Sequence, residues 1–115
     1  MKPAPRTLGP RGKRLWRDIL AEYELTDAEL AILLEACRTA DLVERLDAAI
    51  AGSDLTIPGS RGQVIVHPVA QELRQQRDLL SRLIMRLALP AEDDDGAAAA
   101  RLGRAGAAAR WYGKR

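Results

Sequence analysis

The sequence predicts a mainly α-helical protein: a short first helix, two long antiparallel helices joined by a β-hairpin-like connection, and a flexible C-terminal tail. The chain of 115 residues is 47% hydrophobic but 3% aromatic, with no Phe. Its core must therefore use Leu, Ile, Val and Ala, and a composition rich in Ala, Leu, Arg and Glu favours helix. Three segments repeat apolar residues at three- and four-residue spacing, which is typical of amphipathic helices. A β-branched, turn-rich stretch separates the second segment from the third.

The first helix is expected to begin near Pro10. Its apolar face consists of residues at helical spacing: Leu15, Trp16, Ile19, Leu20 and Tyr23. Residues 1–9 are basic and Pro-rich with nothing evident to bury, so we expect a flexible basic arm. Basic side chains crowd the first turns of this helix, against a helix dipole that favours anions there. That arrangement is easier to explain if an anionic partner lies nearby.

The second helix has the clearest local signal in the chain. Thr26-Asp27-Ala28-Glu29 matches a capping box, in which the Thr hydroxyl and the Glu carboxylate each accept a backbone N–H of the other residue. The apolar stripe continues to about residue 51, and Gly52 is placed to end the helix.

A hairpin is expected next, because β-branched residues flank the turn-rich stretch 58–63. Pro68 suits the first position of a third helix, which should run to about Leu89, before Pro90. Residues 10–90 then form one helical core and oligomerisation domain. Residues 91–115, with an acidic block and an Ala-rich run, are predicted to be a disordered or weakly helical tail.

The net charge of +2 conceals a strong segregation of charge along the chain. Residues 1–17 contain six basic residues and no acid, the second helix is acidic on its polar side, and the third is rich in Arg. The single Cys37 excludes an intramolecular disulfide, and we identify neither a signal peptide nor a run long enough to span a membrane. We therefore expect a protein of the cytoplasm with no membrane partner.

The sequence shows no pattern of catalytic, cofactor-binding or metal-ligating residues. His67 is the only histidine, and Cys37 lies on the apolar stripe of the second helix, where it is expected to pack as a small hydrophobe. The turn at 59–62 lacks the lysine and the following helix of a phosphate-binding loop. We expect a protein that binds partners and has no enzymatic activity, cofactor or metal.

Three groups of residues are candidates for binding. The first group consists of Arg11, Lys13, Arg14 and Arg17. These basic residues are placed to contact phosphates of double-stranded DNA, although charge alone would equally fit a solubilising segment. The second lies on the third helix and suits ion pairing within a subunit or across an oligomer interface: Arg74, Arg77, Arg82 and Arg86. The third, near the C-terminus, could dock on a partner protein or fold back on the domain: Arg110, Trp111, Tyr112 and Lys114.

The first two helices could form a helix-turn-helix, but an acidic second helix is unsuited to lie in a DNA groove. If DNA is bound, we expect contacts to its backbone and not to its bases.

Several motifs, in order, resemble those of terminase small subunits of tailed phages, the P27-like group. The resemblance covers about residues 8–90. It rests on these segments: Leu8-Gly9-Pro10-x-Gly12-x-x-Leu15-Trp16, Glu22-Tyr23-x-Leu25, Glu35-Ala36-Cys37-Arg38-Thr39-Ala40-Asp41, Gly59-Ser60-x-Gly62-Gln63 and His67-Pro68. The family usually has Asn before that proline, where this chain has His67.

The resemblance implies a ring-forming homo-oligomer that recognises the DNA to be packaged. It also implies a partner, the large terminase subunit, which carries the ATPase and nuclease and is recruited and regulated by the small one. Two alternatives stay open: a small helical DNA-binding transcriptional regulator acting as a dimer, and a structural adaptor that binds only protein.

Overall fold

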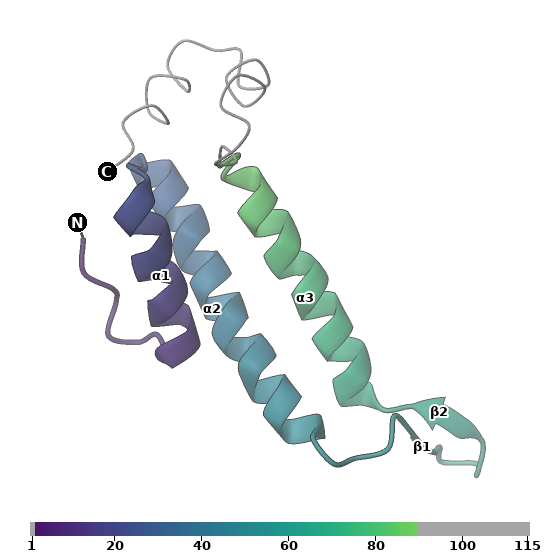
Figure 1. Ribbon diagram of the computed structural model, residues 1–115. Coiled ribbons are helices and arrows are strands. Elements are labelled where there is room, and N and C mark those ends of the chain that lie inside the picture. The colour runs from purple at the N-terminus through teal and green to yellow at the C-terminus, as the bar shows by residue number, and fades with distance from the viewer. Residues whose placement is uncertain (1, 90–115) are drawn as a thin grey trace.

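The computed structural model describes residues 2–89, which form three helices and one hairpin (Figure 1). Helix α2 and helix α3 lie side by side and antiparallel, and α1 packs along α2. This arrangement confirms the predicted fold class. The elements in chain order are α1 (Pro10–Glu22), α2 (Asp27–Ile50), β1 (Thr56–Pro58), β2 (Val64–Val66) and α3 (Pro68–Arg86).

Helix α2 begins and ends as its sequence predicts. The Thr26 hydroxyl accepts the N–H of Glu29, and Oε1 of Glu29 accepts the N–H of Thr26 at 2.8 Å, which completes the capping box. Gly52 follows the C-cap with a φ of +78°, a left-handed conformation that costs glycine nothing. Local signals therefore set both ends of the longest helix.

The connection between α2 and α3 is an antiparallel hairpin. Thr56 pairs with Val66, Ile57 with Ile65, and Pro58 with Val64. Directly after β2, the side chain of His67 caps α3: its Nδ1 accepts the N–H of Val69 at 3.1 Å.

Helix α3 ends at Arg86, a little earlier than the predicted end near Leu89. Ala88 adopts a φ of +51°, which is incompatible with a continuing right-handed helix. The left-handed conformation of Ala88 therefore ends the helix. It does so before Pro90, which lies outside the described residues.

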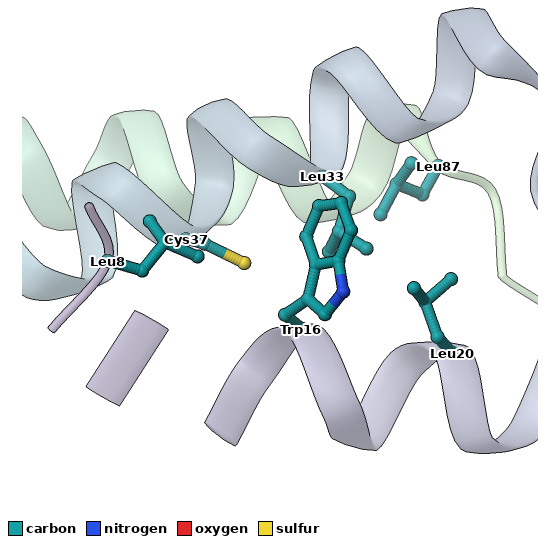
Figure 2. Close-up of a cluster of buried hydrophobic side chains, with 6 residues drawn as sticks. All are labelled: Leu8, Trp16, Leu20, Leu33, Cys37 and Leu87. Carbon is teal, nitrogen blue, oxygen red and sulfur yellow. The ribbon is translucent and has the colours of Figure 1, made fainter. Parts of the chain in front are cut away.

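The hydrophobic core lies where α1 packs on α2, and it includes Leu87 from the end of α3 (Figure 2). It joins side chains from all three helical regions and from the segment before α1: Leu8, Trp16, Leu20, Leu33, Cys37 and Leu87. Within α2, no residue beyond Ala40 is fully buried. The remaining half of the α2–α3 pair therefore has no third layer within residues 2–89.

The expectation that the segment before α1 has nothing to bury is wrong. Leu8 is only 4% exposed and belongs to the core, and Ala4 packs against that core from the same segment. One apolar side chain at the end of a basic, Pro-rich stretch was too weak a pattern to indicate this. Residues 2–8 therefore lie folded against the helices.

None of the helices in the described part of the chain is long and apolar enough to cross a membrane.

Candidate nucleic-acid interface

The start of α1 is held by an acid from another helix. The carboxylate of Asp41, on α2, accepts the N–H of Gly9 at 2.6 Å and the N–H of Gly12 at 2.8 Å. The first N–H groups of a helix have no partner within it, and their end of the dipole favours negative charge. Asp41 thus supplies, from within the chain, the anion that the basic first turns of α1 led us to expect.

Two glycines allow this contact because they carry no Cβ. A Cβ on Gly12 would lie 2.5 Å from Oδ2 of Asp41 and 2.7 Å from the carbonyl oxygen of Cys37, and one on Gly9 would lie 2.9 Å from Oδ1 of Asp41. Such separations are far below van der Waals contact, so a larger residue would push α1 away from α2. The Gly-Pro-x-Gly sequence therefore brings the two helices close together at this point.

Trp16 ties the segment before α1 to that helix. Its ring is in the core, and its Nε1 donates a hydrogen bond to the backbone oxygen of Lys2 at 3.0 Å. The segment from Lys2 to Leu8 is thus anchored at both ends, by this bond and by the burial of Leu8. It therefore runs alongside the exposed basic side of α1.

Between this segment and α1 lies a surface hollow of about 350 Å³. Four of its lining residues are basic and none is acidic: Lys2, Arg6, Lys13 and Arg17, together with Pro3 and Ala4. No ion pair is recorded for these four cations within residues 2–89. Cations converging on one hollow without acids create a positive potential that attracts anions.

The structure divides the four residues predicted to bind DNA. Lys13 and Arg17 line the basic hollow. Arg11 lines a second hollow of about 520 Å³ that also contains Asp41 and Glu44, so the charge there is mixed. Arg14 is exposed on α1 and lines neither hollow.

Two basic residues of the hollow, Lys2 and Arg6, were not among the predicted DNA-binding residues. The sequence places both in the basic N-terminal stretch, which it predicts to be a flexible arm. The signal that could have placed them was Leu8, an apolar residue just ahead of the helix start. Burying Leu8 draws the preceding basic residues against α1.

The arginines of α3 make two ion pairs in the described structure. Arg77 contacts both carboxylate oxygens of Asp47, at 2.8 and 2.9 Å, and so links α3 to α2 within the chain. Arg82 pairs with Asp78 one turn away. Arg74 and Arg86 are exposed, and residues 2–89 contain no ion pair that involves them. The assignment of the four arginines to an oligomer interface stays a prediction.

Cys37 is fully buried in the core. The pKa of its thiol is raised to about 12, mainly by burial and also by the negative charge of Asp41, while a hydrogen bond with the backbone of Trp16 acts in the opposite direction. A thiol is nucleophilic and binds metals only as the thiolate, so Cys37 is chemically inert near neutral pH. No group of three or more potential metal ligands occurs in the described part of the chain.

The predicted partner-binding residues, Arg110, Trp111, Tyr112 and Lys114, lie outside the described residues.

Comparison with known proteins found no matching family model, no matching curated protein and no matching solved structure.

Proposed function

We propose that this chain is the small subunit of a phage terminase, the DNA-recognition and adaptor component of a viral genome-packaging motor. In this role it assembles with copies of itself, binds double-stranded DNA, and recruits and regulates a large subunit with ATPase and nuclease activity. The order of its sequence motifs suggests the family, and the basic hollow beside α1 is the observation that supports DNA binding.

The hollow suits the DNA backbone better than the base edges. Its cations come from two segments that are held together by the core, and none of the residues that line the hollow is acidic. Lys and Arg that neutralise phosphates release condensed counterions, which makes the affinity strongly dependent on salt. Helix α2 presents the acids Glu35 and Glu44 at its exposed surface, which is unfavourable in a DNA groove. We therefore assign the hollow to phosphate contacts that carry little sequence information.

The DNA contact is tested by the double substitution Lys13→Gln and Arg17→Gln. If each residue contacts one phosphate, binding to duplex DNA weakens for all sequences alike. The slope of log K against log salt then falls by about two units, one for each lost contact. A matched control, Arg38→Gln with Arg45→Gln, removes the same charge from exposed positions outside the basic hollow and should leave the slope unchanged. Equal slopes for the wild type and the hollow variant would overturn the assignment.

Assembly separates this proposal from a dimeric transcriptional regulator. A terminase small subunit should form a closed ring of many copies, whereas a regulator of this size would stop at two. Native mass measurement of the full chain distinguishes the two functions. A largest stable species of two copies would contradict the packaging role, and an absence of any DNA binding would favour an adaptor that binds only protein.

A further inference from the structure

The hairpin projects beyond the helices and has no third strand within the described part of the chain (Figure 1). Its apolar side chains are unusually open to solvent: Leu55 is 68% exposed, Val64 75% and Val66 48%. A two-stranded hairpin is at best marginally stable by itself, and an open strand edge offers unpaired backbone groups to another strand. The free edges of this hairpin are therefore candidate docking surfaces.

The register shows which backbone groups face outward. His67 donates its N–H to the carbonyl of Leu55, and Gly59 donates to the carbonyl of Gln63. In an antiparallel pair, the residues that bond across the ladder alternate with residues whose N–H and C=O point away. The bonded positions of β2 are therefore Gln63, Ile65 and His67. Val64 and Val66 point their backbone N–H and C=O groups outward.

The two edges of the hairpin are not equivalent. On β1 the outward positions are Thr56 and Pro58, and proline has no N–H to donate. Proline on an edge strand is a common protection against pairing with another chain. On β2 the outward positions are both valines, so this edge keeps every donor and acceptor. The β2 edge is thus the one that can accept a strand.

We propose that the β2 edge pairs antiparallel with the β2 edge of a second copy of this chain. With the two-fold axis at Ile65, Val64 of each copy lies opposite Val66 of the other, and each such pair exchanges both of its N–H···O=C bonds. The exposed side chains of Val64 and Val66 become cross-strand neighbours and are partly removed from water. The inference does not depend on the proposed function.

Charge favours a second copy as the occupant of this edge. Residues 63–67 contain no Asp, Glu, Lys or Arg, so two copies do not repel each other along the strand. Antiparallel pairing about Ile65 places Arg61 of one copy toward the start of α3 of the other, where Glu72 is exposed. The two ends of the contact are therefore complementary in charge by symmetry.

A two-fold contact closes at two copies and cannot join successive members of one cyclic ring. If the hairpin is the only contact, the assembly is a dimer. If other surfaces build a ring, the hairpins join two such rings. In both cases, loss of the hairpin contact halves the mass of the assembly.

The test compares proline at two facing positions of the hairpin. Val66→Pro removes an outward N–H from the β2 edge and leaves the bonds to β1 in place. Thr56→Pro makes the same change directly opposite, on the β1 edge. We expect native mass measurement to show half the wild-type mass for Val66→Pro and the full mass for Thr56→Pro. Equal masses for both variants and the wild type, or a monomeric wild type, would overturn the proposal.

A cysteine variant tests the register even if proline disturbs the hairpin. At the two-fold axis, Ile65 faces Ile65 of the second copy in a non-hydrogen-bonded pair, with Cα atoms about 4.5 Å apart, which is compatible with a disulfide. Mild oxidation of Ile65→Cys should give a covalent dimer, since Cys37 is buried and unreactive. Leu55→Cys, at a more exposed position, should stay monomeric on a denaturing gel. Equal cross-linking of both variants would indicate random collision and contradict the register.

Discussion

Asp41 connects the start of α1 to α2. Its carboxylate accepts two backbone N–H groups from the start of α1, and Gly9 and Gly12 provide the space for it. Hydrogen bonds to a charged group contribute about 1.5–3 kcal/mol each, more than neutral ones. The contact also lies directly before the turn that presents Lys13 and Arg17. A local arrangement of small and acidic residues thus orients part of the basic hollow.

The substitution Gly12→Ala gives a test in which two effects have opposite signs. Helix propensity alone predicts that Ala stabilises the protein by about 1 kcal/mol. The new Cβ, however, would lie 2.5 Å from Asp41 and 2.7 Å from the backbone of Cys37. Overpacking of this kind costs about 1–3 kcal/mol, so we expect a net loss in the free energy of unfolding measured with urea. A gain in stability would show that α1 does not approach α2 this closely.

Cys37 should make stability decrease at alkaline pH. The thiol ionises near its usual pKa of 9.0 in the unfolded chain, whereas burial raises the pKa to about 12 in the folded protein. Its contribution is therefore fully present below pH 9 and is lost as pH rises toward 12, with a slope of about 1.4 kcal/mol per pH unit. Urea unfolding as a function of pH measures this slope. Cys37→Ala lowers stability at all pH values but should lack this component, so parallel pH profiles for the two proteins would refute the assignment.

At the scale of single elements, contacts between residues that are close in the chain can be predicted from the sequence. The capping box of α2 joins residues three apart, and the hairpin joins β-branched runs across one turn, so both could be predicted. The contact between Gly9 and Asp41 spans 32 residues, and nothing in either segment alone indicates it. The same is true of the hollow, because Lys2 and Arg6 reach α1 only when Leu8 enters the core.

His67 begins α3 with a side-chain cap, and this role predicts which substitutions are tolerated. Its Nδ1 accepts the N–H of Val69, a bond that the amide oxygen of Asn can replace. We therefore expect His67→Asn to unfold at nearly the wild-type urea concentration. His67→Ala should lose about 0.5–2 kcal/mol. If both variants lose the same amount of unfolding free energy, the imidazole stabilises the protein through an interaction other than the cap.

The whole molecule has two unequal ends. The end covered by α1 contains the hydrophobic core and the basic hollow, whereas the other end consists of two helices and an exposed hairpin (Figure 1). A chain this small buries a limited share of its surface, and association between copies is one common remedy. The small size of the chain is compatible with assembly, and the proposed contact at the β2 edge follows from the strand register.

The C-terminal residues provide the last prediction, at the scale of the complete assembly. Trp111 and Tyr112 lie between Arg110 and Lys114, and an aromatic pair flanked by cations suits a short docking peptide. We expect Trp111→Ala with Tyr112→Ala to reduce the stimulation of a large-subunit ATPase, because aromatic anchors dominate the energy of small interfaces. The native mass and the affinity for DNA should be unchanged, since the core and the basic hollow lie within residues 2–89.

A matched control, Lys114→Ala with Arg115→Ala, removes charge from the same short segment and keeps both aromatic residues. If the aromatic side chains are the anchors, this control retains most of the stimulation, because exposed charges contribute little affinity and mainly affect the rate of association. An equal loss in the two variants would assign the contact to charge. Full stimulation by both would contradict the assignment of the partner contact to this segment.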